Sequence, residues 1–392
     1  MAITRTSDFY DLIAQGLNGL GYTSFNDWVD DTFREKYNAE ATFAQMGFPL
    51  NPTLPIRPTY EQLEATVRPY TMAGYVDVDS DGPTKSTDGF SLKMGQIPIF
   101  KHEITIDRKV MRDQLTLASY LGNVTPEIRE VAMSQLFYST DNLIGGNYNT
   151  FRYQRHQIVS KGKLVINATN NPMGIPIEID FGVPSKNITT HKCYTKGANG
   201  TITEKADSNL VQTLKDTKYN AEQKDRCPQG HWEVAKNTWQ NILKLDSLRK
   251  LAVTMSNPLV DDDTRTTLAT YVEEDAFKAW FEKVIGAPVV VVDFIGYVEK
   301  FSTSNKKMEY VDCPAFEEDV MVYVPDGSIG DAQFGKPFVM QTPGARVALF
   351  DGGRTLIRQV FNDENMVQTI KSEVSGLCVP NKTRWFYYVK IA

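Results

Sequence analysis

Two pairs of histidine and cysteine residues are the side chains of this sequence best suited to bind a metal. They form an H-x-C pair and a C-x3-H pair, which comprise His191, Cys193, Cys227 and His231. Imidazole and thiolate are ligands that Zn²⁺ prefers, and a metal could close the polar segment between the pairs. The two cysteines are far apart in the sequence, however, and neither pair has a common zinc-finger spacing. Unrelated residues are therefore the default interpretation, and a structural zinc site is the alternative.

A string of acidic residues is the second candidate metal site. The pattern D-x-D-x-D-G runs from Asp77 to Gly82 and matches the opening of a calcium-binding loop. Asp88 stands at the twelfth position, where a longer glutamate is usual, and Lys85 places a cation at the ninth. These departures favour a solvated acidic hairpin tip. A hydrolase that uses these acids on a metal is an alternative function.

Familiar catalytic motifs are absent from the sequence. It contains no Walker loop, no G-x-S-x-G elbow and no G-x-G-x-x-G after a predicted strand. His102-Glu103 lacks the second histidine of a zinc-protease helix. The histidines are scattered, so no nucleophile and base are paired by sequence: His102, His156, His191 and His231. We therefore expect no enzymatic activity and no cofactor.

Composition indicates a globular protein made in a reducing compartment. The 392 residues are 41% hydrophobic and 23% charged, which allows a sizeable core and two or three domains. No apolar run approaches the roughly 20 residues that span a bilayer, and the start lacks a signal-peptide layout. The four cysteines form no CxxC pair. A net charge of −6 disfavours tight nucleic-acid binding but is compatible with a container for DNA.

The first 110 residues predict two segments that cannot stabilise themselves. In residues 1–64, an amphipathic stretch at 9–20 precedes a series of prolines that includes Pro52 and Pro55, which predicts an extended arm. Residues 65–110 predict a long hairpin with a polar tip, and its returning strand changes face near Phe100-Lys101. An isolated hairpin is marginal in water and needs a partner surface.

The remaining residues predict helices packed on sheets. Residues 126–161 predict a helix of roughly 50 Å that starts at Pro126, is capped by Thr125 and bends or breaks at Gly145-Gly146. Strand, turn and strand follow at 163–182, and residues 189–231 predict a polar surface insertion. The other predicted elements are helices at 236–255 and 263–285, buried β runs at 288–299 and 319–327, and an aromatic strand at 385–391. The fold class is therefore α+β.

Six short strings occur in the same order as in a known family: K-H-E at 101–103, K-G-K at 161–163, I-E-I-D-F-G at 177–182, N-I-T at 187–189, Y-V-E at 297–299 and P-D-G at 325–327. Across about residues 65–392 the chain resembles the lambda-type major capsid proteins (the major capsid protein E family), which have the Johnson, HK-ninety-seven-like, fold. The resemblance implies a structural subunit that assembles into hexamers and pentamers of an icosahedral shell around the double-stranded DNA of a tailed bacteriophage. It also implies assembly in the host bacterial cytoplasm, residence in the virion capsid, and partners that include portal, scaffolding and decoration proteins. Sequence-specific DNA binding and a membrane are not implied.

The resemblance also implies a division of the chain. An N-terminal arm would take residues 1–64, an extended loop 65–110, a peripheral domain with a spine helix 111–188 and 351–392, and an axial domain 232–350. The insertion at 189–231 has no counterpart in the family pattern, and the arm lacks the heptads of a fused scaffold. Candidate contacts between subunits are Ile99, Lys101, His102, Glu103, Pro52 and Pro55. An encapsulin-type compartment, which has the same fold and encloses an enzyme, is the alternative interpretation.

Overall fold

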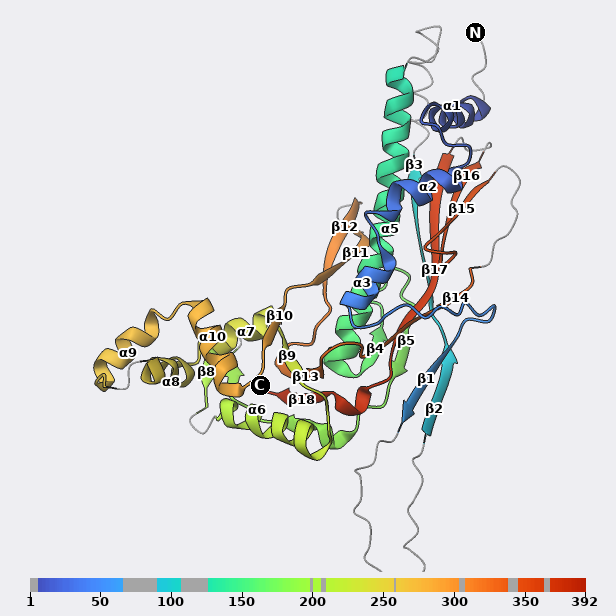
Figure 1. Cartoon of the computed structure of the whole chain (residues 1–392). Coiled ribbons are helices and arrows are strands. Elements are labelled where there is room, and N and C mark those ends of the chain that lie inside the picture. The colour runs from blue at the N-terminus through green and yellow to red at the C-terminus, as the bar shows by residue number, and fades with distance from the viewer. Residues whose placement is uncertain are drawn as a thin grey trace, which may run out of the picture. The chain divides into compact units, whose positions relative to one another are not determined.

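The computed structural model describes residues 6–65, 90–106, 126–197, 200–205, 209–256, 259–302, 307–337, 345–362 and 367–392 (Figure 1). The chain is α+β, as predicted. It divides into two compact units, Met1–Tyr148 with Gly330–Asn381 and Asn149–Ile329 with Lys382–Ala392, whose limits differ from those of the predicted domains. Much of the predicted hairpin, including its tip with the acidic string, and the predicted cap Thr125 lie outside the described residues.

Three helices open the first unit: α1 (Thr6–Gly19), α2 (Phe25–Arg34) and α3 (Ala39–Gln45). The side chain of Ser24 caps α2, and that of Asn38 caps α3. The buried aromatic residues of this segment are Phe25, Trp28, Phe33, Phe43 and Phe48. The spacing of Phe25, Trp28 and Phe33 places them on one side of α2, so this helix packs into the unit. Helix α1 confirms the predicted amphipathic stretch, whereas α2 and α3 were not predicted.

A sheet in the order β14 (Gly330–Gly335), β17 (Val367–Pro380), β16 (Thr355–Asn362), β15 (Arg346–Phe350) forms the frame of this unit. Strand β3 (Ile99–Ile106) also pairs with β17, in antiparallel register. Strands β1 (Thr59–Ala65) and β2 (Phe90–Gln96) form a separate two-stranded ribbon. The change of face falls at Ile97-Pro98, between β2 and β3, and not at Phe100-Lys101. Ile97 is buried and Ile99 is half exposed, because the chain leaves one sheet for another at a proline that cannot donate to either.

Helix α5 (Pro126–Lys161) has the predicted bounds and contributes residues to both units. It continues without a break through Gly145-Gly146, contrary to the expectation. A Cβ atom on Gly145 would lie 2.9 Å from the hydroxyl of Tyr37, and one on Gly146 would lie 2.5 Å from Cε1 of His102. The two glycines therefore allow neighbouring side chains to approach the helix axis closely.

The second unit is built on a sheet in the order β10 (Val289–Val292), β9 (Gly230–Ala235), β13 (Val320–Pro325), β18 (Tyr387–Lys390), β6 (Ile188–Thr190). The outer pairs are parallel and the inner pairs antiparallel. All six residues of β13 are buried. The two predicted helices are each divided, into α7 (Lys236–Leu243) and α8 (Asp246–Ser256), and into α9 (Asp262–Thr270) and α10 (Glu274–Ile285). The divisions let the short helices fold around Trp239, which contacts Phe277 and Phe281 edge-on.

Residues 189–231 contribute several side chains to the core of this unit, whereas a polar surface insertion was predicted. They contain β7 (Tyr194–Lys196), β8 (Ile202–Glu204), α6 (Leu210–Tyr219) and a short π-helix at Asn220–Lys224. Cys193, Tyr194, Leu214 and Cys227 lie in the same apolar cluster as Trp232 and Trp239. The expectation was wrong because a few well-placed apolar residues suffice to bury a segment of polar average composition.

Two further antiparallel ribbons complete the unit: β4 (Lys163–Ile166) with β5 (Ile177–Asp180), as predicted, and β11 (Ile295–Ser302) with β12 (Lys307–Pro314). Among the residues with described positions, no helix is both long enough and apolar enough to cross a membrane.

Candidate functional site

The four candidate zinc ligands have other partners. His191 Nε2 accepts a hydrogen bond of 3.1 Å from the backbone N–H of Asn209. Burial raises the pKa of the Cys193 and Cys227 thiols to about 12, which disfavours metal-binding thiolates. Within the described ranges, no group of three or more His, Cys, Asp or Glu side chains is arranged to hold a metal ion. The described structure therefore does not bring the four candidate zinc ligands together.

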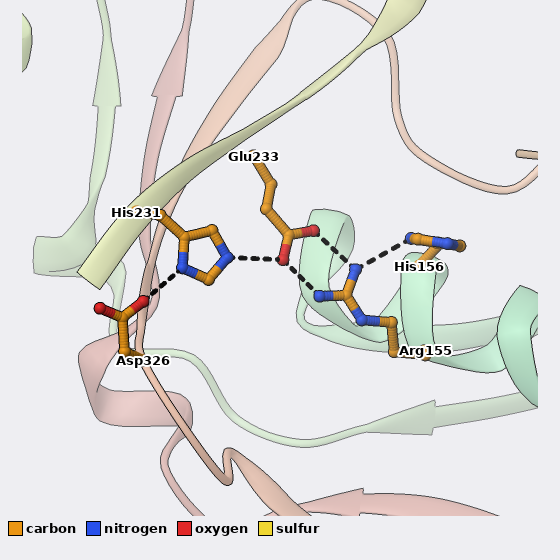
Figure 2. A network of polar contacts seen from close by, with 5 residues as sticks. All are labelled: Arg155, His156, His231, Glu233 and Asp326. Atoms are coloured by element: carbon orange, nitrogen blue, oxygen red, sulfur yellow. Dashed lines mark hydrogen bonds and ion pairs between the residues drawn. The ribbon is translucent and has the colours of Figure 1, made fainter. Parts of the chain in front are cut away.

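His231 belongs instead to a network of charged side chains in the second unit (Figure 2). Its Nε2 lies 3.2 Å from Oε1 of Glu233, and its Nδ1 lies 2.7 Å from Oδ1 of Asp326. The guanidinium of Arg155, from α5, binds both carboxylate oxygens of Glu233, with Nη1 2.7 Å from Oε2. Because the Glu233 side chain is fully buried, this two-pronged ion pair fixes the last part of α5 to strand β9.

Opposing effects set the charges in this network. Burial raises the pKa of Glu233, but the charge of Arg155 and the hydrogen bond from His231 outweigh it and hold this pKa at about 2. Burial lowers the pKa of His231, yet the carboxylates of Glu233 and Asp326 raise it overall. Burial and the charge of Arg155 lower the pKa of His156 to about 3. Glu233 is thus ionised and His156 is neutral at neutral pH, an arrangement that stabilises structure.

Four of the candidate contact residues lie on β3, in the first unit. Its outward face carries two ion pairs with β17: Lys101 Nζ lies 2.7 Å from Glu373, and Lys371 Nζ lies 2.6 Å from Glu103. Each β3 charge is thus already paired within the unit, although the side chains of Lys101 and Glu103 remain 63% and 54% exposed. Ile99 is on the same outward face, and its apolar side chain takes no part in these ion pairs.

His102 faces inward instead. Its Nε2 lies 2.9 Å from Oδ1 of Asn147 on α5, and the Asn147 amide donates to Ser372 on β17. Burial lowers the pKa of His102 despite this hydrogen bond. Pro52 is exposed, and the partly buried Pro55 accepts a backbone hydrogen bond from Lys336. The six candidates are thus divided between surface and interior.

The β11–β12 ribbon presents an exposed apolar face that sequence reasoning missed. Its outward side chains include Tyr297, 65% exposed, Met308, 56% exposed, and Tyr310, 73% exposed, together with Ile295. Glu299 is paired with Tyr310 across the strands, and Asp312 with Tyr297. The sequence does contain the alternating pattern of such a face, as I-x-Y-x-E at 295–299 and M-x-Y-x-D at 308–312. The first pattern was missed because residues 288–299 were predicted to form one continuous buried strand.

The opposite face of this ribbon is attached to its own unit. The ammonium of Lys300 donates to the carbonyl oxygens of Ala168, at 2.6 Å, and Thr169, at 2.9 Å. A Cβ atom on Gly296 would lie 2.9 Å from the ring of Tyr153, so the strand lies directly on α5. This face is therefore anchored at Gly296 and Lys300, while Val311 on the same face remains 37% exposed. The β1–β2 ribbon likewise exposes Leu92 and Met94.

Comparisons with known proteins found likenesses only among solved structures. No protein-family model and no curated protein sequence matches the chain. A putative capsid protein of a prophage of E. coli CFT073 is 14% identical, with 99% of each chain covered and a TM-score of 0.46. The capsid of Myoviridae phage XM1 is 9% identical, with 90% of this chain and 92% of the other covered and a TM-score of 0.40. A virus-like particle from Pyrococcus furiosus is 7% identical, with 93% and 99% covered and a TM-score of 0.38.

Proposed function

We propose that this chain is a shell-forming structural protein, the major capsid protein of a tailed bacteriophage with the Johnson fold. The observation that carries the proposal is the outward face of the β11–β12 ribbon. It holds exposed Tyr297, Met308 and Tyr310 on a ribbon whose other face is anchored to its own unit. Adjacent apolar side chains on an anchored, solvent-facing surface are typical of a protein interface.

The shape of the exposed elements supports a role in assembly. Two-stranded ribbons are marginal in water, and both β1–β2 and β11–β12 expose large apolar residues while the sheets that carry them are well buried. A stable contact between two copies removes on the order of 1,200–2,000 Å² of surface from water. Several such contacts per subunit give a strong shell through multivalency, without any one contact being tight.

The finer assignment rests on the sequence. The ordered strings from K-H-E to P-D-G support the lambda-type family, with hexamers and pentamers as the assembly units. The net charge of −6 suits a wall that encloses double-stranded DNA without binding its sequence. Assembly in the bacterial cytoplasm, with portal, scaffolding and decoration proteins as partners, completes the proposal. The role is structural, and catalysis is not part of it.

Electron microscopy of the full chain overproduced in bacteria tests the proposal. Wild type should form closed particles of uniform size that contain no catalytic activity of their own, with or without a chelator. Met308→Ser and Tyr310→Ser should lower the yield of particles at least severalfold and leave the thermal unfolding of the subunit unchanged. Met173→Ser and Tyr219→Ser are matched controls, because these side chains are 77% and 61% exposed but lie outside both ribbons.

The controls make the outcomes distinct. Equal loss of particles in the ribbon and control variants would remove the ribbon from the interface. A wild-type protein that stays monomeric at high concentration, also when the neighbouring phage genes are expressed with it, would overturn the shell function. Particles that enclose an enzyme and exclude DNA would instead establish the compartment interpretation.

A further inference from the structure

A carboxyl group in the first unit lies where three segments meet. Asp351 is in the turn between β15 and β16, and its backbone has a φ of 56°. The hydroxyl of Tyr148, from α5, lies 3.0 Å from Asp351 Oδ2. The same hydroxyl lies 3.3 Å from the carbonyl oxygen of Tyr37, which belongs to the link between α2 and α3. Tyr148 therefore stands between the turn and the N-terminal helices.

One hydroxyl proton cannot serve both acceptors. Tyr148 has a single O–H donor, whereas the carboxylate of Asp351 and the carbonyl of Tyr37 both accept. When Asp351 is ionised, the charged oxygen is the stronger acceptor and takes the proton. When Asp351 is protonated, its own O–H can donate to Tyr148 Oη, and the tyrosine proton is released for the Tyr37 carbonyl. The protonation state of Asp351 thus decides whether Tyr37 is bonded.

Other contacts show that Tyr37 is where the N-terminal helices are attached to α5. Its ring stacks on that of Tyr148, with centroids 5.3 Å apart, and its hydroxyl donates to Asp141 Oδ1 at 2.8 Å. Lys36 binds the same Asp141 carboxylate at 2.6 Å. Weakening the Tyr37 carbonyl bond therefore acts at the attachment point of α2 and α3.

We propose that Asp351 is a proton-controlled latch, which holds helices α2 and α3 on α5 through Tyr148 and Tyr37 when protonated and weakens that hold when ionised. The other charged groups around it, among the described residues, are Arg354 of its own turn and Asp30 of α2. Burial raises the pKa of Asp351 to about 7, against the hydrogen bond from Tyr148 and the charge of Arg354, and Asp30 raises it further. The latch therefore operates near neutral pH, and it concerns the isolated subunit whatever the subunit assembles into.

The sign and size of the effect follow from linkage. A group whose pKa is raised on folding stabilises the closed state at low pH, and this contribution is lost as pH rises through the folded value. If opening exposes the carboxyl fully, so that its pKa falls from about 7 to the value of about 3.9 for a free aspartate, the equilibrium constant for opening the N-terminal helices rises about tenfold between pH 6 and pH 8.

Hydrogen exchange of the full-length subunit measures this opening. Protection factors of peptides from residues 25–48, corrected for the intrinsic pH dependence of exchange, should fall about tenfold between pH 6 and pH 8. Asp351→Asn should abolish the step, because its amide donates to Tyr148 at every pH and asparagine accepts a positive φ.

Asp141→Asn is the matched control. It weakens the attachment of Tyr37 from the same helix but leaves Tyr148 and Asp351 in place, so protection should fall at both pH values while the tenfold step remains. A wild-type protein with equal protection at pH 6 and pH 8 would overturn the latch. So would an Asp351→Asn variant that keeps the wild-type step.

Discussion

The ion pair between Arg155 and Glu233 offers the sharpest test of how the second unit is held together. Glu233→Gln keeps the size and hydrogen-bonding oxygen of the side chain but removes its charge. Arg155 then remains with only 15% of its side chain exposed and without its buried carboxylate partner. Removing one member of a buried pair typically costs about 3–5 kcal/mol. Because Arg155 retains some solvent and the substituted amide still accepts one hydrogen bond, we expect a loss of about 3 kcal/mol in the free energy of unfolding.

Chemical denaturation followed by tryptophan fluorescence is the assay. Four of the five tryptophans belong to the second unit, namely Trp232, Trp239, Trp280 and Trp385, so the signal reports mainly on it. A double variant with Arg155→Met and Glu233→Leu should recover most of the loss, because an apolar pair of similar volume avoids the cost of desolvating charges. A loss below about 1 kcal/mol in Glu233→Gln would refute this account. So would a double variant in which the two single losses simply add, since residues that interact are not additive.

An exposed ion pair of the same unit provides the control. Lys163 and Glu178 pair across β4 and β5 at 2.9 Å, with side chains 42% and 62% exposed. Surface pairs contribute about 0–1 kcal/mol, so Glu178→Gln should change the free energy of unfolding by less than about 0.5 kcal/mol. A large loss in this variant would show that fluorescence does not isolate the buried pair.

Two further predictions concern histidines. Because His156 has a lowered pKa in the folded chain, the unfolded state binds a proton more readily, and the free energy of unfolding should fall as pH drops from about 6.5 toward 3. The variant His156→Phe keeps an aromatic ring against Phe294 and should reduce the slope of this free energy against pH in that window by up to about 1.4 kcal/mol per pH unit. An unchanged slope in urea titrations would contradict the lowered pKa of His156. Gly146→Ala should lower the free energy of unfolding by about 1–3 kcal/mol even though alanine favours helices, because the added Cβ would meet the His102 ring at 2.5 Å. If calorimetry finds the variant more stable than wild type, the His102 ring can move aside and the prediction is wrong.

Sequence periodicity predicted the elements whose partners are local. The bounds of α5 follow from Pro126 at its start and the apolar spacing along it, and β4 and β5 are joined by a turn rich in asparagine, proline and glycine. Helix α1 was predicted from its amphipathic spacing, but α2 and α3 were missed because prolines farther along dominated the interpretation, although Phe25, Trp28 and Phe33 have a helical spacing. A run of prolines therefore predicts the conformation of its own residues and not that of the segment before it.

Partnerships across long sequence separations escaped prediction for a different reason. His231 stood out as a possible zinc ligand because Cys227 is close to it in sequence, yet its partners are Glu233 and Asp326, and Glu233 is in turn bound by Arg155. Nothing in a one-dimensional pattern places a residue of α5 beside one of β9. Only the folded sheet brings the charges together.

The same reasoning explains why the exposed ribbon was harder to recognise than the core. In β13, every residue is buried by neighbours of the same chain, so an unbroken apolar run is sufficient to predict a central strand. In β11 and β12, the alternating residues Tyr297, Met308 and Tyr310 are as apolar as core residues, but the chain itself leaves them exposed. A sequence encodes such a face for a partner, and its apolar pattern is identical to that of a strand which covers its own core. Exposure in the folded subunit distinguishes the two cases, which is why, for the proposed shell function, loss of particles without loss of subunit stability is the decisive phenotype for this ribbon.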